Sequence, residues 1–425
     1  MDPRSRHSGI TPAGVTLKFE LCRLLNWLKF MKTIISGFGC VCSLGSNTEE
    51  ITKNLFEGSI KPSYMKDRFE SSYAVEYPVF QVPDSILAQR EDGESCSFLF
   101  FRKALLEAME KAGLKKEDFK NMKVGVCAGT SVDASFNCFD FYKNWREGAV
   151  QSLKPLERYI NYSLSAEVLK FLGIEGLSQT VVTACASGTD AIGIGAQWIE
   201  NGFCDIVIAG GADELNLIPF TGFIKLMIAS KDPCKPFDKN RNGINLGEGA
   251  GIFILESQNS VKKRNAIKYG AVLGYGNACD GYHATAPEPE GRGLKKAINF
   301  AMKQAGIAKE KLAFINAHAT GTVDNDLAES KVFNSVLEGV PVTATKGYTG
   351  HALGAAGAVE ACLSLICLNE YKIPKTNNFE TPDENLNTVP VLENAGIEKN
   401  KAALSDSLAF GGCNACIVLA GSDYE

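Results

Sequence analysis

The run Val181-Val182-Thr183-Ala184-Cys185-Ala186-Ser187-Gly188-Thr189-Asp190 carries the most information about this fold. Its β-branched start is typical of a strand, and the small residues after the cysteine are typical of a helix that begins at once. Such a corner lifts the Cys185 sulfur out of the sheet and turns the first free helix N–H groups toward it. These groups favour the thiolate, so we expect a nucleophile. A small buried cysteine at a strand end is the alternative.

The helix expected after Cys185 is apolar on almost every face. Its sequence continues as Ala191-Ile192-Gly193-Ile194-Gly195-Ala196, with Ile199 one turn later. A helix of this kind is buried on all sides, and its glycines lower its helix propensity. Close packing against another element would explain why the glycines are there.

Strand patterns alternate with helical patterns outward from this corner, which predicts an α/β fold with sheet between layers of helices. Helical patterns fill several of the gaps between the strands. The expected strands cover residues 33–39, 123–128, 180–183, 205–210, 251–256, 271–276, 313–317 and 417–420.

Two parts of the chain repeat one order of elements. A helical pattern with a glycine cap over residues 103–117 precedes a strand, and residues 296–310 repeat this pattern before another strand. The strand before Cys185 likewise has a counterpart in Val342-Thr343-Ala344-Thr345-Lys346. Capped amphipathic helices can look alike by chance, but a duplicated α/β unit explains both echoes. Functional groups would then face each other across a pseudo-twofold axis.

Composition narrows the function classes. The chain has 425 residues, 45% hydrophobic and 22% charged, and a net charge of -5, which gives no general basic surface for nucleic acid. Its 14 cysteines lie mostly inside apolar runs, which indicates reduced thiols in a cytoplasmic protein. Charges interrupt the apolar residues 17–30, so we expect no transmembrane segment there. Residues 1–30 are expected to be an upstream extension, an interfacial helix or a start assigned too early.

Histidines are few, at positions 7, 283, 318 and 351. His318 follows the strand expected at residues 313–317, and His351 lies just before the helix that echoes the cysteine helix. The duplicated scaffold would therefore present both rings to Cys185. A single Cys–His pair would suggest a protease-like nucleophile and base. Two histidines suggest that neutral N–H groups also stabilise an enolate.

Two further features lie nearby in the sequence. Lys346 and Glu360 are spaced so that they could form an ion pair between a loop and a helix. The glycines after Phe410 allow tight turns that can direct N–H groups at a ligand. Cys413 and Cys416 have CxxC spacing, but there is no second CxxC, so we expect neither a metal nor a redox centre from that motif.

At this point the motifs resemble one family, the elongating β-ketoacyl-acyl-carrier-protein synthases (KAS I/II type) of the thiolase-like superfamily. The resemblance runs from Met31 to about Ala420. It rests on Thr183-Ala-Cys185-Ala-Ser-Gly188, Pro236-Phe237-Asp238, Gly247-Glu248-Gly249-Ala250-Gly251, Asn316-Ala-His318-Ala-Thr320-Gly-Thr322, Thr345-Lys346, Gly350-His351-Ala-Leu-Gly-Ala-Ala-Gly-Ala-Val-Glu360 and Phe410-Gly-Gly-Cys-Asn414.

The resemblance implies a five-layered αβαβα fold. Residues 31–262 would form the N-terminal thiolase-like half with the nucleophile, and residues 263–425 the C-terminal half with the histidines. It also implies a homodimer, or a heterodimer with a related ketosynthase subunit. Acyl carrier protein would be the partner that delivers substrate, through a local basic patch.

The resemblance further implies a decarboxylative Claisen condensation. Cys185 would carry the acyl chain as a thioester, while His318 and His351 stabilise the enolate from malonyl carrier protein. Lys346, paired with Glu360, would support them. Neither a cofactor nor a metal is implied. The remaining roles would fall to the backbone N–H groups of Cys185 and Phe410 as oxyanion hole, to the Phe410 ring as gate, and to Thr285, Thr320 and Thr322 as pantetheine-binding residues.

Departures from the family pattern leave the pathway open. The family's His-Gly-Thr is His318-Ala319-Thr320 here, its Phe-Gly-Phe-Gly-Gly loop is Leu408-Ala409-Phe410-Gly411-Gly412, and the segment 220–238 is short. These changes suit a polyketide or aryl-polyene synthase as well as a fatty-acid enzyme. A degradative thiolase would need a second catalytic cysteine, for which Cys413 is the nearest residue. A non-elongating chain-length subunit would usually lack Cys185.

Overall fold

The computed structural model describes residues 33–425 except 59, 66–67, 92, 134, 150–151 and 162. The expectations for residues 1–30 therefore lie outside the described residues. Every strand expected from the sequence overlaps a strand of the structure. The strands are β1 (Thr33–Val41), β2 (Val124–Gly129), β3 (Leu177–Val181), β4 (Ile206–Asp213), β5 (Gly249–Glu256), β6 (Gly270–Cys279), β7 (Leu312–Asn316), β8 (Val342–Thr343), β9 (Lys372–Ile373), β10 (Ala395–Gly396), β11 (Ala402–Leu408) and β12 (Cys413–Gly421).

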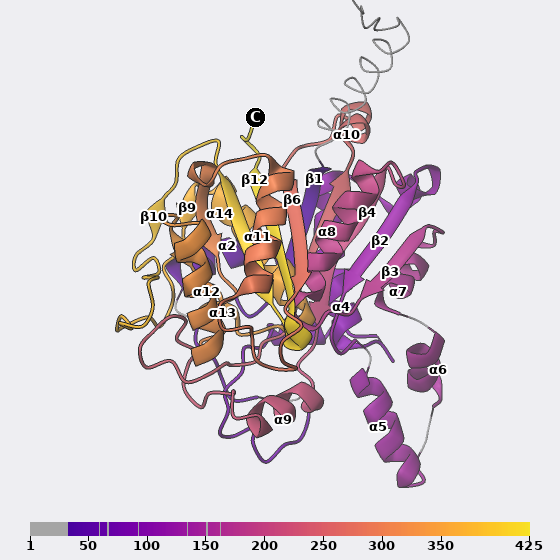
Figure 1. The fold of residues 1–425 in the computed structure, drawn as a ribbon. Helices are drawn as coiled ribbons and strands as arrows, with labels where there is room; N and C mark the ends of the chain where they lie inside the picture. The colour runs from indigo at the N-terminus through magenta and orange to yellow at the C-terminus, as the bar shows by residue number, and fades with distance from the viewer. Residues whose placement is uncertain are drawn as a thin grey trace, which may run out of the picture.

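A ten-stranded sheet in the order β3-β2-β4-β5-β1-β6-β12-β11-β7-β8 forms the centre of the molecule (Figure 1). Its two halves share one topology, because β3-β2-β4-β5-β1 and β8-β7-β11-β12-β6 match strand for strand in chain order. In the first half β2 pairs in parallel with both of its neighbours, and in the second half β7 does the same. The remaining pairs within each half are antiparallel. The halves meet where β1 pairs with β6. The duplicated α/β unit is therefore confirmed.

Helices cover both faces of this sheet and fill the space between its halves. α4 packs on β1, β4 and β5, whereas α11 packs on β6 and β12. Between the halves, α8 and α14 contact each other and strands of both halves. With α4 and α11 on the outside, these contacts give the expected five layers. The helices are α2 (Thr48–Glu57), α3 (Asp84–Leu87), α4 (Cys96–Ala112), α5 (Ser135–Arg146), α6 (Lys154–Asn161), α7 (Leu164–Leu172), α8 (Ser187–Glu200), α9 (Leu217–Lys225), α10 (Gln258–Arg264), α11 (Arg292–Ala305), α12 (Val323–Val336), α13 (Lys346–Thr349) and α14 (Ala356–Asn369).

Local sequence explains the two outer helices that echo each other. Ser95 caps α4 by accepting a hydrogen bond from the Phe98 N–H, and the helix ends at Gly113 with φ 63°. The other helix, α11, ends in the same left-handed way at Gly306, with φ 66°. A glycine in this conformation avoids the strain that a Cβ atom would bring.

The central helices α8 and α14 approach each other closely at glycine positions. A Cβ atom at Gly188 would lie 2.8 Å from the Ala358 nitrogen and 2.9 Å from the Gly354 oxygen, so no side chain fits there. This contact explains Gly188. A Cβ atom at Gly193 would lie 2.2 Å from the Tyr275 ring, and one at Gly195 would lie 2.9 Å from the Ala209 Cβ atom, so these two glycines let α8 pack closely on the strands. Among the described residues no helix is long and apolar enough to span a membrane.

A sharp turn precedes each central helix. The short 3-10 turns Ala184–Ala186 and Leu353–Ala355 lead into α8 and α14, and their first residues have φ angles of 50° and 53°. The structural counterpart of Cys185 is therefore Gly354. The sequence echo correctly located β8, but α13 and His351 are inserted between that strand and its turn. The domain division after residue 262 falls inside α10 and stays a prediction.

Candidate active site

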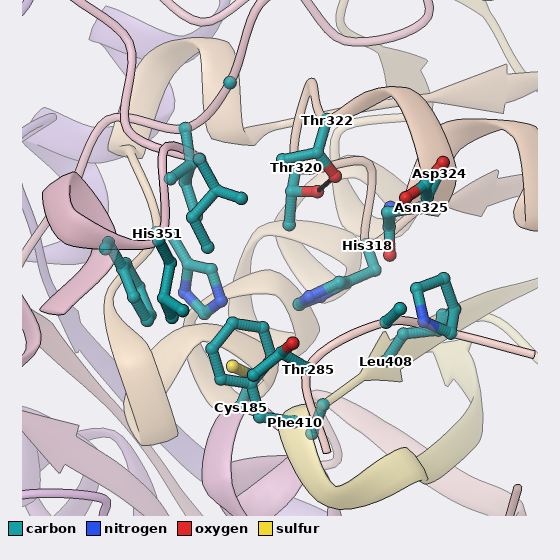
Figure 2. Close-up of a pocket in the computed structure, with 18 of the residues that line it drawn as sticks. Cys185, Thr285, His318, Thr320, Thr322, Asp324, Asn325, His351, Leu408 and Phe410 are labelled. Atoms are coloured by element: carbon teal, nitrogen blue, oxygen red, sulfur yellow. Dashed lines mark hydrogen bonds between the residues drawn. The ribbon is translucent and has the colours of Figure 1, made fainter. Parts of the chain in front are cut away.

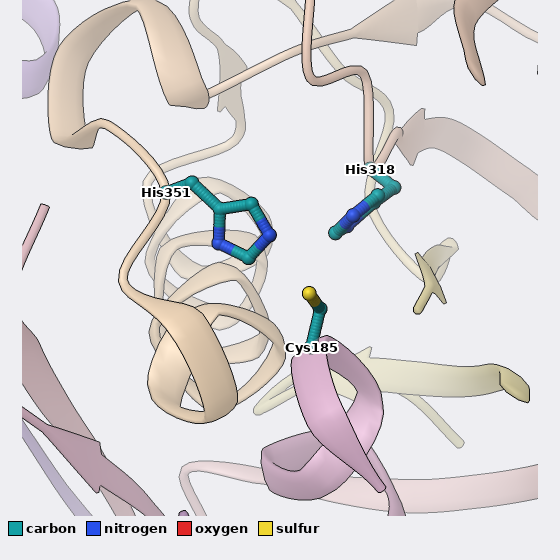
Figure 3. A group of neighbouring side chains, drawn as sticks. All are labelled: Cys185, His318 and His351. Carbon is teal, nitrogen blue, oxygen red and sulfur yellow. The ribbon is translucent and has the colours of Figure 1, made fainter. Parts of the chain in front are cut away.

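A cavity of about 350 Å³ lies where the two halves meet (Figure 2). Cys185, His318 and His351 lie together in it, and their exposed fractions are 7%, 1% and 1%. One donor atom from each lies within 4.8 Å of the others, and Figure 3 shows the sulfur pointing between the two rings. The structure thus brings together the nucleophile and histidines that the duplicated pattern predicted.

Different segments position these three side chains. Cys185 stands on the turn that leads into α8, and His318 lies two residues after the end of β7. His351 follows α13 and is held by its backbone, because its N–H donates to the Asn245 carbonyl at 2.9 Å and its carbonyl accepts from the Gly247 N–H at 2.9 Å. The histidine rings lie 5.2 Å apart and perpendicular to each other.

Hydrogen bonds fix the tautomers of both histidines. The Lys346 ammonium donates to Nδ1 of His318 at 3.0 Å, and the Leu353 N–H donates to Nδ1 of His351 at 3.0 Å. Burial, followed by the Lys346 charge, holds the pKa of each histidine well below its usual value, so both rings are neutral at pH 7. Each neutral ring with an accepting Nδ1 carries its proton on Nε2. The site therefore offers two N–H donors.

The positive charge of Lys346, beside His318, is balanced by a buried carboxylate. Lys346 and Glu360 form the ion pair expected from the sequence, and their side chains are 0% and 2% exposed. Burial raises the pKa of Glu360 to about 7, although the Lys346 charge opposes this rise. Neither residue lines the cavity, so the pair acts on the site through His318.

The sequence-based expectation of a resting thiolate at Cys185 is wrong. Burial raises the pKa of its thiol to about 11, despite the opposing Lys346 charge and hydrogen bonds from the backbone N–H groups of Phe410 and of Cys185 itself. Desolvation outweighs those donors because the sulfur is enclosed by protein. The backbone donors nevertheless converge on the sulfur, where an oxyanion hole for a bound thioester would be needed.

The remaining predicted residues line the same cavity. Thr285, Thr320, Thr322 and Phe410 all belong to its wall, and the Thr320 and Thr322 hydroxyls are 2.8 Å apart. Figure 2 shows both threonines farther from the sulfur than Phe410. Outside the site, His283 shapes the loop of Thr285 by accepting from that residue's backbone N–H at 3.1 Å.

Asp213, at the end of β4, is a structural residue of the site that the sequence analysis missed. It is wholly buried, and its carboxylate accepts from Thr130 Oγ1 at 2.5 Å and from the backbone N–H groups of Ser131, Val132 and Gly354. Burial raises its pKa to about 6. The carboxylate ties the first half to the turn that precedes α14. The sequence pattern that could have identified Asp213 is an acidic residue at the end of a strand, shortly after two consecutive glycines.

Two buried acids behind His318 were also missed. Glu329 accepts from the Ala319 N–H at 2.8 Å and from the Asn325 amide at 2.5 Å. Burial and the Asp406 charge raise the pKa of Glu329 well above its usual value, and burial raises the pKa of Asp406 to about 7. Two such neighbouring acids cannot both ionise readily, so they hold at least one proton at neutral pH.

The same three side chains also resemble the ligands of a metal site. Among the described residues, Cys185, His318 and His351 form a group whose donor atoms lie close enough to hold one ion. A thiolate and two imidazoles are ligands that Zn²⁺ accepts. The expectation that the protein uses no metal stays a prediction.

Family models and known proteins match most of this chain. Residues 32–260 match the family model described as beta-ketoacyl synthase, N-terminal domain, and residues 269–380 match its C-terminal domain. The chain is 32% identical over 420 residues to 3-oxoacyl-[acyl-carrier-protein] synthase 2 of Synechocystis sp., covering 94% of this chain and 99% of that relative.

Solved structures agree with the sequence matches. The ishigamide ketosynthase/chain length factor superposes with a TM-score of 0.85 at 31% identity, covering 92% of this chain and 99% of that one. A type II polyketide ketosynthase, solved in complex with its acyl-carrier protein and bound to a hexaketide, gives a TM-score of 0.83 at 26% identity, covering 92% and 99%. By fold, site and full-length similarity, the chain belongs to the β-ketoacyl synthase family of acyl-transferring condensing enzymes.

Proposed function

We propose that this protein is a β-ketoacyl-acyl-carrier-protein synthase that condenses malonyl carrier protein with an acyl chain held on Cys185. The observation that carries this proposal is the pair of neutral imidazoles, both protonated on Nε2, beside a buried thiol. A hydrolase would need one ring with a free Nε2 as base. Two N–H donors suit an enolate oxygen.

In the first half-reaction, the Cys185 sulfur attacks the carbonyl carbon of an acyl thioester on the carrier protein. The N–H groups of Cys185 and Phe410 that converge on the sulfur would stabilise the oxyanion. The thioester bond to the pantetheine arm then breaks, and the thiol proton lost by Cys185 leaves with the departing pantetheine thiol. The acyl chain remains as a thioester on Cys185.

In the second half-reaction, malonyl carrier protein loses its carboxylate as CO₂. The electron pair passes into an enolate whose oxygen accepts hydrogen bonds from His318 and His351. The enolate carbon then attacks the acyl carbonyl carbon, and the bond to the Cys185 sulfur breaks. The sulfur takes up one proton, which restores the thiol. Lys346 keeps His318 in the donating tautomer throughout.

Supporting assignments follow from the cavity wall. Thr285, Thr320 and Thr322 would hold the pantetheine arm, and the Phe410 ring, 5.5 Å from the Phe223 ring, would gate the acyl pocket. We propose residues 31–262 and 263–425 as the two domains, the division predicted from the sequence. The described cysteines are all free, which supports a reducing compartment, the cytoplasm.

Partner assembly also belongs to this proposal. β3 is an edge strand of the sheet, and its first residues are exposed. An open edge of this kind pairs readily with another chain. We propose a dimer through this edge, with a second copy or with a related ketosynthase subunit, in line with the ketosynthase/chain length factor relative. Native mass spectrometry of the purified protein would identify which dimer forms.

The test measures acylation and malonyl decarboxylation separately. We expect wild type to gain an acyl group from acyl carrier protein, as seen by intact mass, and to release CO₂ from malonyl carrier protein. Cys185→Ala should abolish acylation but keep decarboxylation, whereas His318→Ala and His351→Ala should lose decarboxylation. Cys204→Ala removes another buried thiol, outside the cavity, as matched control.

Some results would overturn the proposal. An enzyme that never becomes acylated but still decarboxylates would be a chain-length-type subunit. Cleavage of β-ketoacyl thioesters by coenzyme A without decarboxylation would indicate a degradative thiolase. Cys413, the second cysteine that a thiolase would need, does not line the cavity. Intact-mass analysis with a panel of acyl carrier proteins would also give the preferred chain length.

A further inference from the structure

Cys279 and Cys413 lie directly opposite each other where β6 ends and β12 begins. The Asp280 N–H donates to the Gly412 carbonyl at 2.8 Å, so the hydrogen bond passes outside this pair of cysteines. The two cysteines therefore form a non-hydrogen-bonded pair of an antiparallel ladder. In such pairs the Cα atoms are about 4.5 Å apart and the side chains point the same way. This separation falls within the range that a disulfide spans.

Cys416, the CxxC neighbour of Cys413, is not its partner in this pair. Side chains alternate along a strand, so residues three apart point to opposite faces. Cys416 is wholly buried, opposite Gly276, in the core beneath α11. The partner of Cys413 is thus a residue distant in sequence.

The pair is accessible to small reagents. Cys279 is the exposed cysteine among those that the structure describes, and its sulfur lies 3.6 Å from the Gly411 carbonyl. Cys413 is partly buried, and burial raises the pKa of its thiol. Oxidation would therefore start at Cys279.

We propose that Cys279 and Cys413 are a site of reversible oxidative modification that forms a cross-strand disulfide. With hydrogen peroxide as oxidant, the Cys279 thiolate attacks one peroxide oxygen, the O–O bond breaks, and a sulfenic acid and hydroxide form. The Cys413 sulfur, giving up its proton, then displaces the sulfenic hydroxyl as water. In sum, two thiols lose two electrons and two protons, and peroxide becomes two waters. A dithiol reductant reverses the change by thiol–disulfide exchange.

The modification site adjoins the active-site loop. The Gly411 N–H donates to the Ala284 carbonyl at 2.7 Å, and the Asn414 amide donates to Asp280 at 2.9 Å. A disulfide would therefore fasten residues 410–412 to the loop that starts at Asp280 and carries Thr285. Phe410 contributes a backbone N–H to the Cys185 sulfur. This consequence rests on the proposed function: the fastened loop should slow acyl transfer by several-fold or more.

Peptide mapping tests the modification without any activity assay. The full-length Cys185→Ala variant is treated with hydrogen peroxide, blocked with iodoacetamide, digested without reductant and analysed by mass spectrometry. A linked Cys279–Cys413 peptide that disappears after dithiothreitol is expected, and Cys279→Ser should abolish it. A linked Cys413–Cys416 peptide, or only sulfinic acid at Cys279, would overturn the proposal.

Acyl-transfer assays test the consequence. Cys279→Ser should keep wild-type acyl transfer and resist the oxidant, whereas oxidised wild type should slow and recover with dithiothreitol. Cys413→Ser gives the same test from the partly buried side. If the disulfide forms and the rate does not change, the loop argument fails. If the protein transfers no acyl group even when reduced, the proposed function fails while the modification stands.

Discussion

Replacing Lys346 by Met tests the buried charge pair at the centre of the site. The substitution leaves Glu360 buried, 2% exposed, with no cation beside it. Its Oε2 atom already has no hydrogen-bond partner among the described residues. Breaking a buried ion pair from one side costs about 3–5 kcal/mol of unfolding free energy. Glu360 can reduce this cost by taking up a proton, because its pKa rises further once the Lys346 charge is gone.

The sign of the pH dependence follows from that pKa. A carboxyl with a raised folded-state pKa loses stability as pH rises from its unfolded value to its folded value. In wild type this window runs from 4.5 to about 7, and in Lys346→Met it extends higher. The variant should therefore be far more destabilised at pH 8 than at pH 5.5. Glu360→Gln combined with Lys346→Met should cost less than the two single changes summed.

Catalysis should fall in the same variant for a separate reason. Without the Lys346 ammonium, His318 loses the hydrogen bond that holds its proton on Nε2. A hydrogen bond to a charged group contributes about 1.5–3 kcal/mol, so decarboxylation of malonyl carrier protein should slow roughly ten- to a hundredfold.

Urea unfolding at both pH values and CO₂ release together measure these effects. Lys331→Met is the matched control, because its ion pair with Glu290 is partly exposed, at 36% and 69%, and should matter little at either pH. Equal destabilisation of Lys346→Met at pH 5.5 and 8, or an unchanged decarboxylation rate, would refute the reasoning.

Three further predictions concern the same site. Alkylation of Cys185 by iodoacetamide should rise roughly tenfold per pH unit from pH 7 to 10, because its pKa is about 11; a plateau near pH 8 in mapped peptide yields would contradict this. Zn²⁺ should inhibit acyl transfer by binding Cys185, His318 and His351, and a chelator should restore it; calorimetry that shows equal zinc binding to Cys185→Ala would disprove that site. Gly188→Ala should lower the unfolding free energy by about 1–3 kcal/mol, because its Cβ atom meets backbone of α14 at 2.8 Å. Gly222→Ala should not lower the unfolding free energy in this way, because a Cβ atom there would meet nothing within 4 Å. Thermal melts of the two variants measure the difference.

The fold could be predicted from the sequence because both halves contain local sequence patterns. The β-branched runs and the glycine caps after α4 and α11 depend on neighbouring residues alone. Cys185, His318 and His351 were identified because each lies beside a strand pattern or a helical pattern in the sequence. Their convergence followed once the repeat was recognised.

Other features depend on contacts that no local pattern contains. The pKa of Cys185 moved opposite to expectation because enclosure by both halves outweighs the nearby N–H groups. Asp213 takes its hydrogen bonds from three consecutive residues and from Gly354, far away in sequence. Cys413 likewise faces Cys279 rather than its CxxC neighbour. Such relations appear only when the strands are paired.

The turn at Gly354 explains why the duplicated fold holds one nucleophile and not two. It occupies the place in the second half that Cys185 occupies in the first, yet a Cβ atom there would lie 2.6 Å from the Ser131 nitrogen and 2.8 Å from an Asp213 oxygen. No side chain, and hence no second nucleophile, can return to that turn while Asp213 bonds its backbone. The two equivalent turns therefore have different roles: the first presents the Cys185 side chain to the cavity, and the second, without a side chain, is bonded to Asp213 of the first half.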